Sequence, residues 1–363
     1  MLIKTDDFVY NPLGGASYIF KDSLLKYIHS KLHKNKLLIS IGAQPNSSPH
    51  FGTLCVFSLA FALASELKLN YKNLYVSILF EVVDTAPSEQ LIINNVNYQK
   101  SLKSTGVINN YMPQFEEILE YLSQMTSVLY KIRYQREFNK QKEIPGYIKK
   151  LIGKQQDVAK YLDPKNENLR IRSACPQCGL ADKNSINNSY SDDKITCICP
   201  IHGRYSLNID KESEKLEYNT PTRNLIRAMV YGDINSNKEY DYEIIRITGA
   251  DYAGFYQEEL LYKVAAMLDY DVTKLPMILY CPLITDWSGA KLSKTLYVKH
   301  GAYSDLPKYL INYEFLKEEK GIWGLQQIYK ICEEWIKEPY KLFRNYSIYY
   351  FMYKFEKKTK EQK

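Results

Sequence analysis

The chain lacks any run of apolar residues long enough to cross a lipid bilayer. Its most apolar stretch, Cys55–Ala64, is better explained as a buried helix. The segment Met1–Tyr10 carries Asp6 and Asp7 and has no apolar core, so we expect neither a secretory signal nor a transit peptide. These absences argue against a membrane-bound or a secreted protein.

A large excess of charge of one sign is also missing, since the net charge is +7 over 363 residues. Such a balance permits a polyanionic partner without requiring one. We expect no DNA or membrane partner. Charged residues make up 25% and hydrophobic residues 45%, which is typical of a folded soluble protein. Seven cysteines without any sign of secretion indicate the reducing cytoplasm.

The first informative motif is a glycine- and proline-containing turn between an apolar run and an apolar helix. Leu37–Ile41 predicts a buried strand, Pro45–Thr53 the turn, and the alanine-rich Gly52–Leu67 a largely buried helix. A strand, a turn and a helix in this order are typical of a mononucleotide-binding crossover, whose helix N-terminus attracts phosphate. His50 would lie at that entrance, and Gly52 would let a nucleotide approach the backbone. A surface turn with an incidental histidine explains these residues equally well when they are taken alone.

The second motif is a pair of lysines on a loop. Met277–Cys281 predicts a strand, Ser288 and Gly289 a mobile turn, and the peptide Lys291–Thr295 follows. Two lysines three residues apart can both reach a triphosphate and stabilise the charge that develops at its α-phosphorus. The alternative is a solvated basic loop.

A third element lies between these two motifs. Ile244–Thr248 predicts a strand that ends in Gly249-Ala250-Asp251 before a helix. Gly249 would allow adenosine to approach the backbone, and Asp251 would accept a hydrogen bond from a ribose hydroxyl. Capping of the following helix is an equally good explanation for Asp251 in isolation.

Together these residues resemble the catalytic domain of class I aminoacyl-tRNA synthetases over roughly residues 35–300. His50-Phe51-Gly52-Thr53 is similar to the HIGH signature, Lys291–Thr295 to KMSKS, and Gly249-Ala250-Asp251 to the glycine-aspartate element between them. The cysteine-containing insertion and the stretch Thr222–Arg227 look most like the archaeal-type lysyl-tRNA synthetase. Three residues depart from the signatures: Thr53 replaces the second histidine, Leu292 the methionine and Thr295 the last serine. A threonine hydroxyl can still donate a hydrogen bond to phosphate or ribose, and leucine keeps the volume of methionine.

The resemblance implies a set of functional residues and cofactors. It assigns catalysis to His50, Lys291 and Lys294, with ATP and Mg²⁺ as cofactors. It implies an ATP site formed by Gly42, Gly52, Thr53, Gly249, Asp251 and Ser293. The acceptor end of tRNA would be the partner, and lysine is one candidate for the amino acid.

Two copies of one short cysteine motif predict a metal site. Cys175-Pro-Gln-Cys178-Gly and Cys199-Pro-Ile-His202-Gly follow the same pattern, with 20 residues between Cys178 and Cys199. Each copy aims two ligands at one point, so the pair predicts a closed Cys₃His site of the kind that holds structural zinc. Cys197 is the rival fourth ligand if His202 points away.

The order of these motifs predicts an α/β protein with a Rossmann-like parallel sheet, a zinc-binding insertion and a C-terminal helical stem. We expect residues 1–139 to contain a helical lead-in and the first half of the nucleotide fold, with strands near 37–41 and 74–83 and an amphipathic helix from about 113 to 138. Residues 140–218 would form the insertion and 219–300 the second half of the fold. Residues 301–363 would form the stem, which leaves no room for an anticodon-binding domain.

The amino acid pocket is less clearly marked in the sequence. Asp84 and Glu81 end a predicted strand at the edge where ligands bind, and Tyr252 and Gln257 follow the Gly-x-Asp turn. We rank Asp84 above Glu81 because it lies past the strand end. Each of these residues also has an explanation as a core or surface residue.

These patterns predict ATP-dependent activation of an amino acid and its transfer to tRNA. One alternative is a truncated synthetase paralogue that transfers the activated amino acid to a small molecule or a protein. Another is a non-catalytic RNA-binding paralogue, although such a protein would have no need for His50, Gly52, Lys291 and Lys294 together.

Overall fold

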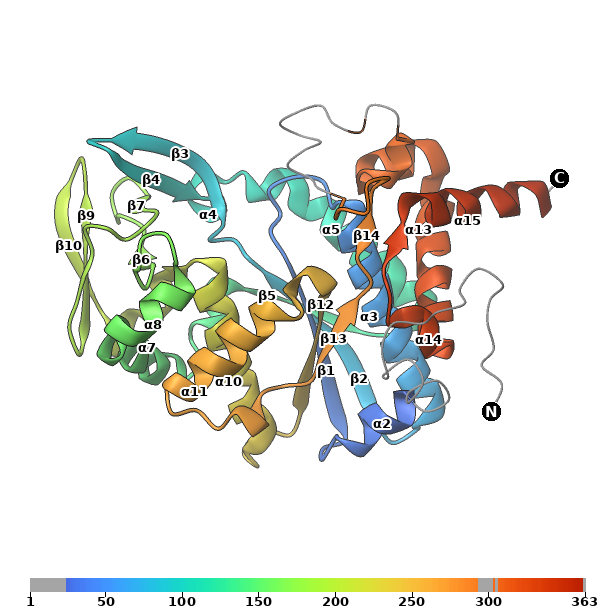
Figure 1. Ribbon diagram of the computed structural model, residues 1–363, viewed down its shortest axis with the longest axis horizontal. Helices are drawn as coiled ribbons and strands as arrows, with labels where there is room; N and C mark the ends of the chain where they lie inside the picture. The colour runs from blue at the N-terminus through green and yellow to red at the C-terminus, as the bar shows by residue number, and fades with distance from the viewer. Residues whose placement is uncertain (1–23, 293–302, 304–305, 362–363) are drawn as a thin grey trace.

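A five-stranded parallel sheet forms the centre of the molecule (Figure 1). The computed structural model describes residues 24–292, 303 and 306–361. The strands lie in the order β13 (Ile278–Cys281), β12 (Glu243–Gly249), β1 (Lys36–Ala43), β2 (Tyr75–Val82) and β5 (Tyr130–Tyr134), and all neighbours are parallel. From β1 the sheet extends through β2 and β5 on one side and through β12 and β13 on the other. The strand order therefore reverses between β1 and β12, as in Rossmann-like doubly wound folds.

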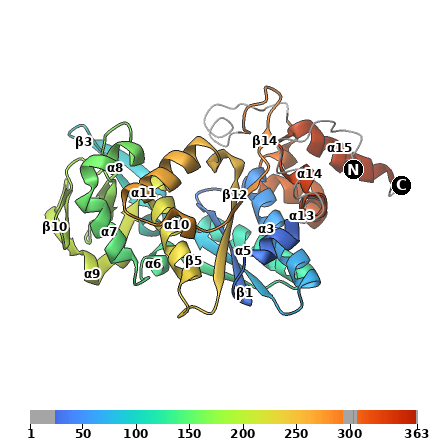
Figure 2. The same cartoon turned by 60° about the horizontal axis from the view of Figure 1, so that its bottom comes forward.

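Both faces of this sheet are covered by helices, which explains why its strands are nearly continuous apolar runs. One face packs against α3 (Phe51–Asn70) and α5 (Ile108–Thr126), and α13 (Tyr313–Lys337) packs on α3. The other packs against α10 (Thr220–Ser236) and α11 (Val264–Met267), as the rotated view in Figure 2 also shows. This is the α/β fold class that the sequence predicts.

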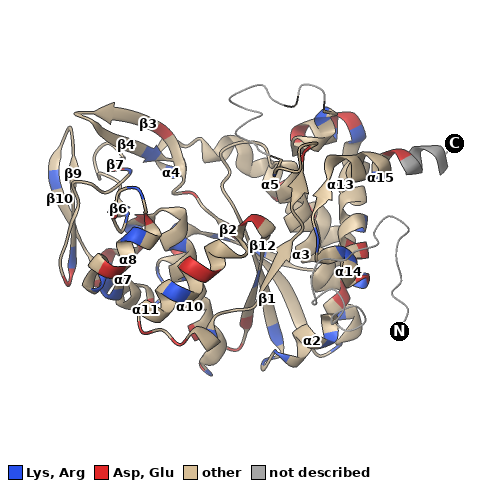
Figure 3. Ribbon diagram, viewed as in Figure 1, with Lys and Arg blue, Asp and Glu red and all other residues tan. Residues whose placement is uncertain are grey.

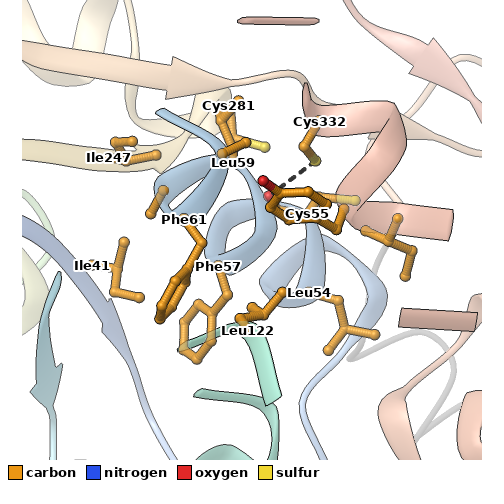
Figure 4. Close-up of a cluster of buried hydrophobic side chains, with 14 of the residues drawn as sticks. Ile41, Leu54, Cys55, Phe57, Leu59, Phe61, Leu122, Ile247, Cys281 and Cys332 are labelled. Atoms are coloured by element: carbon orange, nitrogen blue, oxygen red, sulfur yellow. Dashed lines mark hydrogen bonds between the residues drawn. The ribbon is translucent and has the colours of Figure 1, made fainter. Parts of the chain in front are cut away.

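Helix α3 is the core helix of the molecule. It is the one helix in the described part of the chain that is long and apolar enough to span a membrane, and 72% of that window is buried inside the protein. Its side chains Leu54, Phe57, Leu59 and Phe61 lie in the cluster of Figure 4, and the Cys332 thiol on α13 donates to the carbonyl oxygen of Cys55. The expectation of a buried helix here is confirmed.

The predicted helix over 113–138 is wrong in its second half. Helix α5 ends at Thr126, and Ser127 adopts a left-handed conformation with φ of 53°. The chain then enters β5, which pairs with β2, and Leu129 is 75% exposed. Apolar residues continue at helical spacing beyond Thr126 into β5, so the spacing alone does not show where the helix ends.

A hairpin that the sequence did not reveal joins the first half of the fold to the cysteine-containing insertion. Strands β3 (Pro87–Ile93) and β4 (Val96–Ser101) turn at Asn94 and Asn95, both with positive φ. Paired asparagines of this conformation favour a tight hairpin turn. Strand β4 also pairs with β7 (Leu180–Asp182), so the hairpin and the insertion share one sheet.

The elements between β5 and α10 lie at one end of the molecule (Figure 1). Two helices, α7 (Ile144–Gly153) and α8 (Gln155–Leu162), pack with the other face of the sheet. Strands β9 (Lys194–Cys199) and β10 (Gly203–Asn208) form an antiparallel ribbon that β8 (Ser189–Tyr190) extends, and β6 (Ile171–Ser173) pairs with β11 (Leu216–Tyr218).

The C-terminal helices pack on α3 at the opposite end from the insertion (Figure 1). Helix α13 bends at Gly321, which has φ of 58°, and is followed by α14 (Pro339–Leu342) and α15 (Ile348–Glu361). Trp335 is fully buried and stacks on Tyr346 in β15 (Tyr346–Ser347). The described part of the predicted N-terminal lead-in forms α2 (Leu24–Ser30).

Candidate active site at the carboxyl edge of the sheet

A cavity of about 570 Å³ opens where β1, β12 and β13 end. Its lining includes eight of the residues that the sequence assigned to the site, namely Gly42, His50, Gly52, Thr53, Gly249, Asp251, Tyr252 and Lys291. Sites for small ligands commonly measure ~300–1,000 Å³, and in doubly wound sheets they lie at the point where the strand order reverses. Segments about 240 residues apart in the sequence thus meet in one cavity of suitable size and position.

His50 caps the N-terminus of α3. Its backbone is extended, with φ of −74° and ψ of 161°, and its Nδ1 accepts a hydrogen bond from the amide of Thr53 at 3.3 Å. A Cβ atom on Gly52 would lie 3.2 Å from Cε1 of His50. Position 52 therefore requires glycine if the imidazole is to stay where it is.

The His50 turn also contacts the C-terminal part of the chain, a relationship that the sequence did not predict. The amide of Phe51 donates to the carbonyl of Ile311 at 3.0 Å, and the amide of Tyr313 donates to the carbonyl of Pro49 at 2.8 Å. The amide of Glu314 donates to Oγ of Ser48 at 3.1 Å. The start of α13 thereby fixes the turn from which His50 projects.

Lys291 and Asp251 form an ion pair at the cavity, with 2.5 Å between Nζ and Oδ2. The carboxylate of Asp251 lies close over Gly249, because a Cβ atom added at Gly249 would come within 2.4 Å of its Oδ1. The structure thus places the predicted ribose acceptor beside one predicted phosphate ligand. Ser293 and Lys294 lie outside the described residues, and their roles stay predictions.

The turn before Lys291 is ordered by Asp286, a residue that sequence reasoning missed. Its carboxylate accepts hydrogen bonds from the amide and the hydroxyl of Ser288 and from the hydroxyl of Tyr303. Burial works to raise the pKa of Asp286, but these hydrogen bonds outweigh it and leave the pKa below its ordinary value. Gly289 has φ of 81°, so the turn that we expected to be mobile is a hydrogen-bonded turn that needs glycine.

Three arginines line the cavity, although the sequence analysis assigned none of them to the site. Arg223 and Arg227 project from α10, four residues apart on one helix face, and Arg246 comes from β12. Arg223 donates to Oγ1 of Thr220, Arg227 to Oε1 of Gln135 and Arg246 to Oδ1 of Asn224, at 3.1–3.2 Å. Burial, with the neighbouring charge of Arg227, lowers the pKa of Arg223 to about 9 and also lowers the pKa of Arg246.

Glu81 is fully engaged by the protein. Both of its carboxylate oxygens accept hydrogen bonds from the guanidinium of Arg133, and one also accepts from the hydroxyl of Tyr231. Burial opposes ionisation, but the charges of Arg133 and Arg227 outweigh it and hold the pKa of Glu81 below its ordinary value. The Glu81 carboxylate is therefore ionised and committed to Arg133.

Asp84, which we ranked above Glu81, does not line the cavity. It lies beneath the start of α4 (Leu102–Thr105), and its carbonyl accepts from the amide of Lys103 at 3.0 Å. Burial raises the pKa of its carboxyl group. The structure does not bring Asp84 to the lining of this cavity, and its contact with the substrate stays a prediction.

Gln257 is also outside the cavity lining, in contrast to Tyr252. Its side chain accepts from the hydroxyl of Tyr280 at 2.7 Å and donates to the hydroxyl of Tyr262 at 2.5 Å. It begins a π-helical segment, Gln257–Lys263, a rare conformation that is frequent at functional sites. The wall that we assigned to Gln257 is formed instead by Tyr252 and Asn224.

The four predicted metal ligands converge in the insertion. The ligand atoms of Cys175, Cys178, Cys199 and His202 all lie within 4.8 Å of one another. Zinc–sulfur bonds of about 2.3 Å require a spread of this size around one ion. Gly179 and Gly203, which end the two motifs, have φ of 76° and 77°, so both turns need glycine.

This cluster decides between the two candidates for the fourth ligand. Nδ1 of His202 lies 3.6 Å from the sulfur atoms of both Cys175 and Cys199. Cys197 lies on β9 opposite Tyr205, outside the cluster. No ligand of the cluster lines the cavity described above, so its geometry fits a structural metal better than a catalytic one.

The strand order and the position of the cavity define a Rossmann-like nucleotide-binding fold. Neither family models nor curated proteins match the chain. Among solved structures it is similar to a glutamate-tRNA synthetase from Elizabethkingia anophelis, with 14% identity and a TM-score of 0.34 over 73% of this chain and 54% of that one. A putative arginyl tRNA synthetase from Campylobacter jejuni has 12% identity and a TM-score of 0.33 over 85% and 68%. A glutamate tRNA ligase from Elizabethkingia meningosepticum has 13% identity and a TM-score of 0.40 over 87% and 67%.

The chain thus spans little more than half the length of the first of these synthetases. Likeness at this level concerns the fold alone. The site is defined by the residues of this chain and their geometry.

Proposed function

We propose that this protein activates an amino acid with ATP and transfers it to the acceptor end of tRNA. One observation carries the proposal: the His50 turn, the Gly249-x-Asp251 element and Lys291 come from three remote segments and line a single cavity. Each motif alone has an ordinary structural explanation. Their convergence at the point where the strand order reverses favours a shared nucleotide site.

In this proposal Gly42 and Gly249 let adenosine approach the backbone, and Asp251 accepts from a ribose hydroxyl. The triphosphate lies at the N-terminus of α3, where Gly52 offers a backbone amide, Thr53 a hydroxyl group, and the helix dipole favours an anion. His50, Lys291, Ser293 and Lys294 contact the phosphates.

The reaction needs no protein nucleophile. A carboxylate oxygen of the amino acid forms a bond to the α-phosphorus, and the bond from that phosphorus to the bridging oxygen of pyrophosphate breaks. The cationic groups stabilise the charge of the transition state and of the leaving pyrophosphate, and Mg²⁺ bound with ATP would supply further positive charge. A hydroxyl of the terminal ribose of tRNA would then attack the carbonyl carbon of the aminoacyl-adenylate, whose bond to the phosphate oxygen breaks to release AMP.

The zinc ion would be held by Cys175, Cys178, Cys199 and His202, where it crosslinks two turns of the insertion. The donor set of three thiolates and an imidazole is closed, so the ion would stabilise the fold without taking part in the reaction. We also propose the reducing cytoplasm as its location, because a site with three thiolates needs reduced cysteines.

Exchange of labelled pyrophosphate into ATP, measured for each proteinogenic amino acid with and without bulk tRNA, tests the proposal. We expect exchange with one amino acid, and a loss of orders of magnitude in His50→Ala, Lys291→Ala and Lys294→Ala. Lys142→Ala is a matched control, because Lys142 forms an exposed ion pair with Glu239 away from the cavity. Absence of exchange with every amino acid would contradict activation and favour the RNA-binding alternative.

Transfer of label from the activated amino acid to acid-precipitable tRNA then tests the second step. Exchange without such transfer would favour the alternative acceptor, a small molecule or a protein. The lysyl-type resemblance makes lysine one candidate for the amino acid, and the charge of the cavity bears directly on that choice.

A further inference from the structure

The cavity holds more positive charge than the proposed ATP chemistry uses. Arg223 is 5% exposed and Arg227 2% exposed, and Arg246 completes the group on the neighbouring strand. All three lie on the side of the sheet that α10 covers, whereas the proposed phosphate site lies at the N-terminus of α3 on the other side (Figure 1). The arginine cluster of these three residues therefore serves a different part of the ligand.

The described residues supply too few carboxylates to neutralise this arginine cluster. Within the described residues, Arg223 and Arg246 form no ion pair, and Arg227 has only Glu81 at 3.8 Å. That carboxylate already pairs closely with Arg133. Figure 3 shows the distribution of acidic and basic residues over the elements.

The hydrogen bonding of the arginine cluster is incomplete as well. Nε of Arg223 and Nε of Arg227 are buried and have no hydrogen-bond partner. Their contacts described above, to Thr220 and Gln135, are to neutral oxygen atoms. A buried guanidinium whose partners are all neutral, as for Arg223, costs stability, so its presence in a cavity indicates a ligand that brings negative charge.

We propose that the amino acid activated here carries an acidic side chain, whose carboxylate is bound by Arg223, Arg227 and Arg246. This inference rests on the proposed function. The planar fork of arginine matches a carboxylate with two parallel hydrogen bonds, and Tyr252 and Asn224 add polar groups to the same wall. An ammonium side chain such as that of lysine would meet like charges at this position, so the arginine cluster selects against it.

Equilibrium dialysis of the full-length protein with labelled glutamate, aspartate, glutamine and lysine tests the inference. We expect one of the two acidic amino acids to bind and glutamine and lysine to bind at least about 30-fold more weakly, since a buried charge pair would be lost. Binding of lysine or glutamine in preference to both acidic amino acids, or no binding of either acidic one, overturns the inference.

Pyrophosphate exchange with the same four amino acids separates this inference from the proposed function. Exchange supported by lysine alone leaves the proposed function standing and overturns the acidic substrate. Binding of an acidic amino acid without pyrophosphate exchange supports the inferred ligand and contradicts the proposed activation.

Arg223→Met then distinguishes a ligand-binding arginine from a structural one. We expect binding of the acidic amino acid to fall by at least about 30-fold while the melting temperature stays equal or rises, because an unpaired buried charge is removed. Arg204→Met, at an exposed position on β10, is the control. A lower melting temperature with unchanged amino acid binding would show a structural role and overturn the assignment.

The affinity for ATP, measured without amino acid, decides whether the arginine cluster instead serves phosphate. We expect Arg223→Met to leave it unchanged. A loss of ATP affinity equal to the loss of amino acid affinity would assign the arginine cluster to the triphosphate.

Discussion

Nζ of Lys291 lies 2.5 Å from Oδ2 of Asp251, which precedes it by 40 residues in the chain. The two side chains are 47% and 30% exposed, so solvent weakens their attraction. An exposed ion pair contributes about 0–1 kcal/mol, little enough for a stronger ligand to replace either partner. The pair thus holds two predicted ATP ligands in place without committing them to each other.

Asp251→Asn tests this relationship. We expect the free energy of unfolding to change by less than about 1 kcal/mol, while the KM for ATP in pyrophosphate exchange rises because a ribose acceptor is lost. The control is Asp241→Asn, since Asp241 forms an exposed pair with Lys36 at the start of β1, whereas the cavity lies at the carboxyl end of that strand. An unchanged KM for ATP would remove Asp251 from the ribose site.

Gly52→Ala tests the close approach of the backbone to His50. The added methyl group would lie 3.2 Å from Cε1 and 3.3 Å from Nδ1 of the imidazole, so the ring must move. We expect exchange to fall at least about tenfold while the melting temperature changes little, since a misplaced catalytic group costs rate more than stability. Gly146→Ala is the matched control in helix α7, where an added Cβ meets nothing within 4 Å.

The control should gain stability, because alanine is favoured over glycine in a helix by about 0.5–1 kcal/mol. Full exchange activity in Gly52→Ala would show that the imidazole position is not critical. The comparison separates an effect on the site from a general effect of adding a methyl group to a helix.

The parts of the site that the sequence predicts are those whose residues lie together in short, contiguous peptides. The turn at His50, the Gly249-x-Asp251 element and the two cysteine motifs depend on backbone conformation within a few residues, and local sequence determines that conformation. Strand β1, strand β12 and helix α3 could also be predicted from the sequence, because their apolar runs are clear signals of buried elements.

The parts that the sequence did not predict depend on contacts between distant segments. Arg223 on α10 and Arg246 on β12 line the same cavity only because the helix packs on the sheet. Asp84 lies beside the start of α4 and outside the cavity lining, a position that the sequence does not indicate. Strand β5 was absorbed into the preceding helix because an edge strand of five residues carries too short a pattern. Arg223 and Asp84 are both buried polar residues, and only the folded structure shows that they are buried.

Removal of the metal tests the role of the cysteine cluster. We expect about one zinc ion per chain, and a chelator should lower the melting temperature, because a structural zinc ion contributes folding energy directly. His202→Ala and Cys199→Ser should lose the metal and melt at a lower temperature. Cys197→Ser should keep the full metal content, because Cys197 lies outside the cluster.

A metal content that falls in Cys197→Ser but not in His202→Ala would reverse the assignment of the fourth ligand. Metal content is read by atomic absorption, so this test does not depend on activity. Full exchange activity in a chelated protein that remains folded would show that the insertion is stable without the ion.

The pH dependence of stability should differ in sign between two carboxylates at the end of β2. The pKa of Glu81 is held below its ordinary value of 4.5. A group of this kind stabilises the fold above its unfolded pKa, and its contribution is lost as the pH falls through the folded pKa. We therefore expect Glu81→Gln to cost about 3–5 kcal/mol at neutral pH, because Arg133 loses its buried partner. The difference from the wild type should shrink in the acid range below about pH 4.5.

Asp84 should behave in the opposite way, because burial raises its pKa above the ordinary value of 3.8. The folded state then resists ionisation, so the wild type loses stability as the pH rises from the unfolded pKa to the folded one. Asp84→Asn removes this cost, and we expect the variant to be more stable than the wild type at neutral pH and to match it in strong acid. Urea denaturation of both variants across the acid range measures the two slopes. Slopes of the same sign would show that Lys103 compensates Asp84 as fully as Arg133 compensates Glu81, since each is the positive charge that lowers the pKa of its carboxyl group most.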